Sequence, residues 1–231
     1  ILADAGADVS CLRVMDTESG CAFIEVNSKG QNRIIVSAGT NRMYTEEYIK
    51  NVLEKAEAGD FVLLQNEINM VGEIIRLSHE KGCRVVFNAS PIPGKPEELP
   101  LELVDIFMVN ELEAAALAGT STEGDFRDIL KALQKKYPKA AIVMTLGKEG
   151  VFYGYKEEFY SHPIFKVNAV DTTAAGDTFC GYFLAALCAE KSVETALREA
   201  SAASAMAVSA KGAAPSIPVH SAVEEWLCGR S

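Results

Sequence analysis

Residues 61–88 decide the fold class, and they read FVLLQNEINMVGEIIRLSHEKGCRVVFN. The runs FVLLQ at 61–65 and RVVFN at 84–88 are apolar and have the length of buried strands. Between them, apolar residues recur at helical spacing over 69–82, and Gly82 stands where a glycine ends a helix. A strand, a helix and a second strand in this order are typical of a parallel sheet with helices on its faces.

The same alternation continues along the chain. Two more strands are expected, at 105–109 and 140–145. The helices expected around and after them lie at 111–118, 123–137, 176–189, 192–210 and 220–228. This order extends the parallel sheet and adds a helical C-terminal part.

Paired short strands predict two hairpins. They are expected at 21–26 with 32–36, around the turn-rich NSKG at 27–30, and at 151–154 with 157–160. After the first hairpin the spacing becomes helical, with Thr45 as the expected N-cap and Gly59 as the residue that ends this helix.

Composition narrows the class of protein. The 231 residues fit one domain, or one domain with a small appendage. Thirty-two acidic against 22 basic residues give a net charge of −10, which makes the chain a poor partner for nucleic acid or an anionic membrane. No apolar run approaches the roughly 18 residues that a membrane helix needs. The six cysteines form no C-x-x-C motif and are interpreted as reduced, buried thiols of a cytoplasmic protein.

Polar or small residues follow four of the predicted strands. They are Asn66 and Glu67, Asn88, Asn110 with Glu111 and Glu113, and Thr145 with Gly147. Ligands of open α/β sheets bind beyond the carboxyl ends of the strands, so these residues predict where a site lies. Strand ends are commonly polar in any case, and Glu67 or Glu111 would then be simple solvated acids.

The stretch DTTAAGDTFCGYF at 171–183 contains the candidate catalytic residues. Small side chains at Ala174, Ala175 and Gly176 open a predicted helix and leave its first N–H groups uncovered, which favours an anion there. Such a hole stabilises the charge of a phosphoryl group in transfer. Asp177 stands at its mouth, where a carboxylate can accept a proton from a hydroxyl. From local sequence alone, Asp177 can also be a simple N-cap or first-turn acid.

This stretch resembles the C-terminal signature of the ribokinase (phosphofructokinase-B) family of sugar kinases, D-T-x-G/A-A-G-D-x-F. Four more segments resemble that family in the same order: LLQNEI at 63–68, VNELEA at 109–114, MTLGKEG at 144–150 and AVSAKGAAPSIP at 207–218. The resemblance covers nearly the whole chain. It implies an α/β fold, a three-layer sandwich with a largely parallel sheet and a small β lid at about 21–36, forming one kinase domain over 1–231.

The resemblance also implies roles for particular residues. Asp177 matches the catalytic base at the sugar hydroxyl, with Ala174, Ala175 and Gly176 as the anion hole, and Glu67 matches a sugar-site residue. Asn110 and Glu113 match the pair that organises Mg²⁺ through waters. Nucleotide contacts are implied at Asn110, Thr145, Gly147, Gly176, Ser201 and Gly212. A monovalent-cation loop for K⁺ is implied at Asp171, Thr173, Ala207, Ala210, Gly212 and Ser216.

The chain departs from the family pattern in two ways. Nothing before residue 60 resembles the family's early Asp or its G-G-x-G-x-N motif, which hold the sugar, so the domain is expected to be incomplete at its N-terminus and its sheet to lack central strands. Ser201 stands where relatives often carry a larger ring-contacting residue, and Asn69 replaces a common proline. Both changes are expected to shift nucleotide or sugar preference.

The expected activity is transfer of the γ-phosphoryl group of ATP to a primary hydroxyl of a small sugar, D-ribose first of all, with Mg²⁺ and K⁺. A family kinase for fructose, deoxyribose, ketodeoxygluconate or a nucleoside stays open, as does a non-catalytic nucleotide-binding remnant. A nicotinamide dehydrogenase is disfavoured because the chain has no G-x-G-x-x-G. The lid is expected to pair two subunits in a homodimer, with neither nucleic acid nor membrane as a partner.

Overall fold

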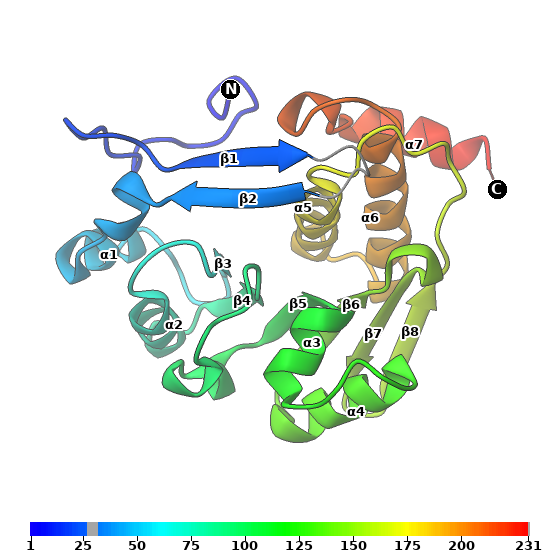
Figure 1. Ribbon diagram of the computed structural model, residues 1–231, viewed down its shortest axis with the longest axis horizontal. Helices are drawn as coiled ribbons and strands as arrows, with labels where there is room; N and C mark the ends of the chain where they lie inside the picture. Colours follow the sequence, from blue (N-terminus) through cyan, green and yellow to red (C-terminus); the bar gives the residue numbers. More distant parts are fainter. Residues whose placement is uncertain (27–31, 231) are drawn as a thin grey trace.

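A six-stranded sheet forms the centre of the computed structural model, which describes residues 1–26 and 32–230. Its strands are β3 (Phe61–Gln65), β4 (Arg84–Asn88), β5 (Ile106–Asn110), β6 (Ala141–Thr145), β7 (Val151–Tyr155) and β8 (Glu158–His162). They lie side by side in chain order (Figure 1). The first four run parallel, and β7 and β8 continue the sheet as an antiparallel hairpin. The predicted, largely parallel α/β sheet is confirmed.

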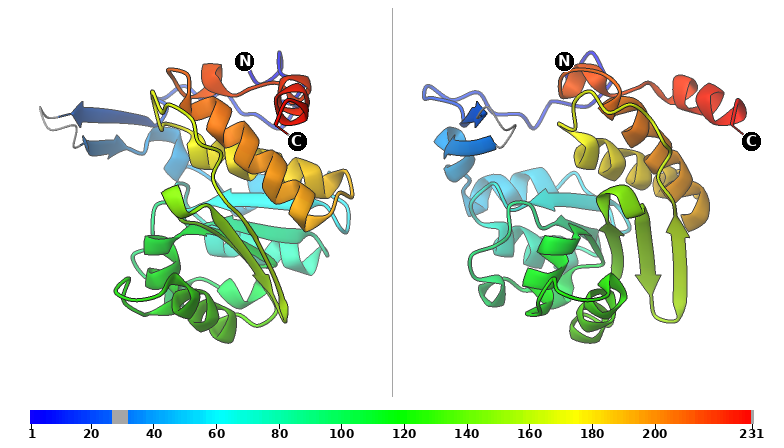
Figure 2. Two further views of the ribbon diagram at one scale, coloured as in Figure 1. Left: turned by 90° about the vertical axis from the view of Figure 1, so that its right-hand side faces the viewer. Right: turned by 45° about the vertical axis from the view of Figure 1, so that its right-hand side comes forward.

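Helices cover both faces of this sheet (Figure 2). One face packs against α1 (Glu46–Leu53), α2 (Val71–Glu80), α3 (Glu111–Ala118) and α4 (Phe126–Lys136). The other packs against α5 (Ala175–Cys188) and α6 (Val193–Val208), and α7 (His220–Cys228) packs on α6. Short 3-10 helices lie at Gly39–Arg42, Pro96–Glu98, Leu101–Leu103, Gly147–Glu149 and Ala214–Ser216. Over the described residues, no helix combines the length and the apolar content that a membrane crossing needs.

The residues of β4 show why the sheet needs cover on both faces. Val85 and Phe87 pack in the core under α1 to α4, whereas Val86 packs in the core under α5 and α6. All three side chains are fully buried. Because burying one such side chain contributes roughly 1.5–3 kcal/mol, a strand that is apolar on both sides is stable only between two helical layers.

A second, smaller sheet stands apart from the first. β1 (Cys21–Val26) and β2 (Asn32–Ser37) pair antiparallel, with Phe23 opposite Ile35. Both views of Figure 2 show this pair projecting away from the six-stranded sheet. The two predicted strands are confirmed, β2 being one residue longer, while the predicted turn at 27–30 lies outside the described residues.

Several predicted helix bounds are wrong. α2 runs over Val71–Glu80 instead of 69–82, and α4 begins at Phe126 instead of 123. α1 ends at Leu53, and Gly59 instead occupies a later turn with a φ of 95°, where a side chain would be strained. α6 ends at Val208, two residues earlier than predicted. The Val208 carbonyl accepts the N–H groups of Val170 and Asp171, so the loop before α5 takes the place of another helical turn.

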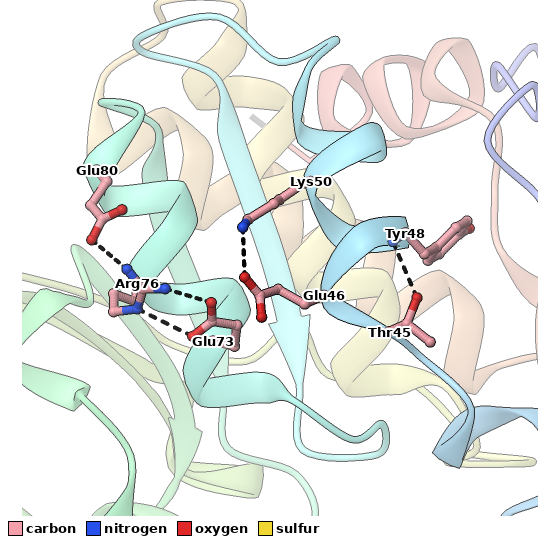
Figure 3. A network of polar contacts seen from close by, with 7 residues as sticks. All are labelled: Thr45, Glu46, Tyr48, Lys50, Glu73, Arg76 and Glu80. Carbon is pink, nitrogen blue, oxygen red and sulfur yellow. Dashed lines mark hydrogen bonds and ion pairs between the residues drawn. The ribbon is translucent and has the colours of Figure 1, made fainter.

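Ion pairs lie on the exposed surfaces of α1 and α2, and a side-chain hydrogen bond caps the start of α1 (Figure 3). Thr45 Oγ1 accepts the N–H of Tyr48 at 3.2 Å, which confirms Thr45 as the N-cap of α1. On α2, Arg76 bonds both Glu73 and Glu80. Exposed pairs of this kind typically contribute ~0–1 kcal/mol each, so the buried faces of the two helices supply most of their stability.

The cysteines are only partly as expected. Cys11, Cys21, Cys83, Cys180 and Cys188 are free thiols, as predicted. Cys83 and Cys180 are buried, and burial raises the pKa of each thiol. Cys21, Cys188 and Cys228 are exposed, so the interpretation of every cysteine as a buried apolar side chain is wrong for these three.

Candidate active site

A pocket of about 230 Å³ opens where the parallel strands end. The last residue of each parallel strand lines it: Gln65 of β3, Asn88 of β4, Asn110 of β5 and Thr145 of β6. The strand register brings these ends together in two pairs, since Gln65 pairs with Asn88 and Asn110 pairs with Thr145. Asn88 pairs with Met108, so β5 and β6 extend two residues further than β3 and β4. The pocket therefore lies at the sheet edge where the sequence predicted a site.

The first turn of α5 forms the opposite wall. Ala174, with a φ of 58°, precedes the helix without a side-chain cap, and Ala174, Ala175 and Gly176 all line the pocket. In the described part of the chain, the N–H groups of Gly176 and Asp177 have no backbone acceptor. Free N–H groups at the positive end of a 14-residue helix favour an anion in this pocket.

The start of α5 is held in place and left open toward the pocket. Ser204 Oγ on α6 donates to the Ala175 carbonyl at 3.0 Å, which fixes the beginning of α5 against its neighbour. A Cβ added at Gly176 would meet nothing within 4 Å. A ligand can therefore approach the backbone at Gly176 closely.

Asp177 presents its carboxylate to the same pocket. Gln65 Nε2 donates to Asp177 Oδ1 at 3.0 Å, across the space between β3 and α5. One turn further along α5, burial raises the pKa of the Cys180 thiol to about 12, so this neighbour stays a neutral thiol near pH 7. Asp177 is exposed and can be reached by a bound hydroxyl.

Asn110 and Glu113 are joined in a reciprocal cap at the start of α3. Asn110 Oδ1 accepts the N–H of Glu113, and Glu113 Oε2 accepts the N–H of Asn110, each at 2.9 Å. Burial raises the pKa of the Glu113 carboxyl, while hydrogen bonds from Asn110 and Ser90 oppose that shift. Both side chains line the pocket, and each keeps a second polar atom that the cap does not use.

The loop before α5 is tied to the loop after α6. Asp171 Oδ1 accepts the Thr173 hydroxyl at 2.6 Å and its N–H at 3.0 Å, and Asp171 Oδ2 accepts the Gly212 N–H at 3.0 Å. These hydrogen bonds, that from the Thr173 hydroxyl first, lower the pKa of Asp171 to about 2. Ser216 is buried nearby in sequence and donates to the Ala213 carbonyl at 2.8 Å.

Comparison with known proteins identifies the family. The model described as pfkB family carbohydrate kinase matches residues 1–220. The chain belongs to the pfkB family of carbohydrate kinases. It is 38% identical to the ribokinase of Bacillus subtilis, in a match that covers 93% of this chain and 70% of the relative. With the ribokinase of Haemophilus influenzae the identity is 35%, over 97% of this chain and 74% of the relative.

Solved structures of pfkB kinases agree with this assignment. A ribokinase crystal structure from Thermotoga maritima matches with a TM-score of 0.80 at 35% identity, covering 93% of this chain and 71% of that chain. The structure of Arabidopsis thaliana ribokinase complexed with ribose and ATP matches with a TM-score of 0.77 at 31% identity, covering 92% and 70%. The chain thus has the ribokinase-like fold and is a carbohydrate kinase.

Not every residue implied by the pfkB resemblance lines the pocket. Glu67 is exposed in the turn after β3, Gly147 begins the 3-10 helix after β6, and Ser201 is half-buried on α6. None of these three, nor Gly212 in the loop after α6, is among the residues that line it. Their roles as sugar and nucleotide contacts stay predictions.

The sequence analysis did not identify Gln65 as a pocket residue. It considered the residues after β3, Asn66 and Glu67, whereas the last residue of the strand itself reaches the pocket. The signal was present, because in β4, β5 and β6 it is likewise a polar residue at the very end of the strand that lines the pocket. Matching the four strand ends position by position would have selected Gln65.

Proposed function

We propose that this carbohydrate kinase transfers the γ-phosphoryl group of ATP to a primary hydroxyl of a small sugar, with D-ribose as the first candidate. The relatives named above are ribokinases, and the Arabidopsis structure is described as a complex with ribose and ATP. One observation in this chain carries the proposal: the Asp177 carboxylate and the open N-terminus of α5 share one pocket.

The proposed chemistry needs a base and a site for negative charge. Asp177 accepts the proton of the sugar hydroxyl, whose oxygen then forms a bond to the γ-phosphorus as the bond to the leaving ADP oxygen breaks. The N–H groups of Gly176 and Asp177 face the charge that moves through the transition state. Positioning and charge neutralisation then supply most of the rate enhancement.

Mg²⁺ fits the oxygen atoms at the start of α3. Asn110 Oδ1 accepts one hydrogen bond in the cap and has a second lone pair, and Glu113 offers a carboxylate. Such oxygens are ligands that Mg²⁺ prefers, and the ion usually keeps several waters and substrate phosphates as its other ligands. Over the described residues, no group of three or more His, Cys, Asp or Glu side chains is placed to hold a metal ion. An ion held here would therefore depend on nucleotide phosphates. When bound, Mg²⁺ neutralises charge on those phosphates.

K⁺ fits the paired loops around Asp171. Asp171 carries a negative charge at neutral pH, and the neighbouring chain turns at Gly212 with a φ of 98°. The resemblance adds Thr173 and Ser216 and the carbonyls of Ala207, Ala210 and Gly212 as the remaining ligands. A monovalent cation supplies positive potential close to the α5 N-terminus.

A lid, a homodimer and the nucleotide contacts complete the proposal. The β1–β2 pair carries exposed Phe23 and Ile35 on one face, which supports a role as a lid that also pairs two subunits. Thr145, which lines the pocket, is proposed to contact ATP together with Gly147 and Gly212. A cytoplasmic location also stays a prediction.

The Asp177→Asn variant tests the proposed chemistry. It keeps the size of the side chain and removes the proton acceptor, so sugar-dependent ADP formation should fall about 10²- to 10⁴-fold. ATP binding, measured by calorimetry, should change little because the α5 N-terminus is intact. Turnover within tenfold of the unchanged chain would overturn the role of Asp177 as the base.

A further inference from the structure

Gln65 lies where it can act on the proposed catalytic base. It is the last residue of β3 and lines the pocket together with Asp177, which belongs to the first turn of α5. The two residues are 112 positions apart in the chain, and Gln65 Nε2 donates to Asp177 Oδ1 at 3.0 Å. Within the described residues, this is the side-chain contact that holds the Asp177 carboxylate.

The position of Gln65 on β3 directs its side chain toward α5. Alternate residues of β3 face opposite sides of the sheet, and Val62 and Leu64 belong to the core under α1 to α4. Phe61 packs on the other core, under α5 and α6, and Gln65 shares that face. Its backbone is fixed by pairing with Asn88 of β4, so the amide is presented from a rigid element.

A primary amide suits the task of orienting a carboxylate. Its N–H donates to one carboxylate oxygen, Oδ1, and leaves Oδ2 for the proton of a substrate hydroxyl. An Asp side chain at an exposed helix position otherwise samples several rotamers. A general base acts only when it is held within hydrogen-bond reach of its proton, and a displacement of about 1 Å can cost 10²-fold in rate.

We propose that Gln65 is a positioning residue that orients the carboxylate of Asp177 for proton transfer from the substrate hydroxyl. This inference rests on the proposed function. The contact is exposed in the open pocket, and a bound substrate that excludes water would strengthen it. The role is exerted through Asp177 and requires no contact between Gln65 and the substrate.

The Gln65→Met variant tests the proposal, because Met has nearly the same length and lacks the N–H donor. The sugar-dependent kcat should fall about tenfold to hundredfold, with the KM for sugar and for ATP within about threefold of the unchanged chain. Gln65→Glu keeps the shape and sets a like charge beside Asp177, so its kcat should fall at least as far. Gln134→Met, the same exchange on α4 outside the pocket, should leave kcat unchanged.

A double-mutant cycle separates positioning from a merely structural role. If Gln65 acts through Asp177, Gln65→Met should lower the residual kcat of the Asp177→Asn variant by less than about twofold. The same loss of kcat in both backgrounds, an unchanged kcat in Gln65→Met, or a change confined to the sugar KM would each overturn the positioning role. An unchanged chain without sugar-dependent turnover would overturn the proposed function, and the positioning role with it. Melting temperatures confirm that each variant is folded.

Discussion

At the scale of single residues, the pocket depends on a residue without a side chain as well as on polar side chains. Gly176 has no Cβ at the point where the helix N-terminus faces the pocket, and a Cβ there would meet no protein atom. In the described structure, contact with neighbouring atoms therefore does not require a small residue at this position. Close approach of an anion to the backbone is the physical reason that remains.

Gly176→Ala should separate stability from activity. Ala is favoured over Gly within a helix by up to ~1 kcal/mol, so the melting temperature should stay equal or rise. The added methyl group would project into the space proposed for the phosphoryl group, so kcat should fall about tenfold or more. Thermal melts and ADP formation on the same preparations check both parts. An unchanged kcat in the folded variant would count against an anion hole at this position.

The sequence predicted Asp177 as a site residue but did not lead us to Gln65. Asp177 was selected because its motif combines small residues, an acid and a helix start within a few positions, all of them visible in sequence. The pattern of polar strand ends indicates Gln65 as a pocket residue, but its contact with Asp177 could not be predicted because the two are 112 residues apart. Only the packing of β3 beside α5 brings the two together, and no local pattern encodes that distance.

At the scale of elements, the joined loops around Asp171 fix the start of α5. Asp171 accepts three hydrogen bonds from Thr173 and Gly212, which link the loop before α5 to the loop after α6. A carboxylate with such bonds in the folded state has a lower pKa there than in the unfolded chain. The pKa of Asp171 is about 2, below its ordinary value of 3.8.

This linkage predicts a pH dependence. Because the folded-state pKa is lowered, the stability from Asp171 is fully present above about pH 4 and is lost as the pH falls toward about 2. Asp171→Asn should therefore melt at a lower temperature than the unchanged chain at pH 7, and the difference should shrink as the pH approaches 2. Circular dichroism melts over this pH series measure it, with Asp16→Asn on the exposed N-terminal segment as a charge-matched control. A difference that stays constant with pH would contradict the linkage.

Most elements could be predicted because their signals are local. The apolar runs of β3 and β4 gave exact bounds, and Thr45 was recognisable as an N-cap from the helical spacing after it. The ends of α1 and α6 could not be predicted. Where α6 stops depends on a carbonyl of Val208 that accepts N–H groups from Val170 and Asp171, nearly 40 residues earlier in the chain.

At the scale of the whole molecule, the β1–β2 pair forms a separate sheet that projects away from the six-stranded one (Figure 2). Phe23 and Ile35 lie opposite each other and are 61% and 50% exposed, an unusual exposure for paired apolar residues. We expect the chain to be a homodimer through this pair, with twice the chain mass of 24.9 kDa by light scattering. Phe23→Asp should yield the monomer mass, whereas Phe159→Asp, at an exposed site on β8, should not. A monomer mass for the unchanged chain would contradict the homodimer.

We propose that this carbohydrate kinase uses Asp177 and the α5 N-terminus in its pocket. The most direct measurement is ADP formation by the purified chain with Mg-ATP and K⁺, compared across ribose, deoxyribose, fructose and adenosine. We expect ADP formation that depends on the sugar and is fastest with ribose. ATP binding without turnover on any of the four acceptors would contradict it and favour a non-catalytic nucleotide-binding protein.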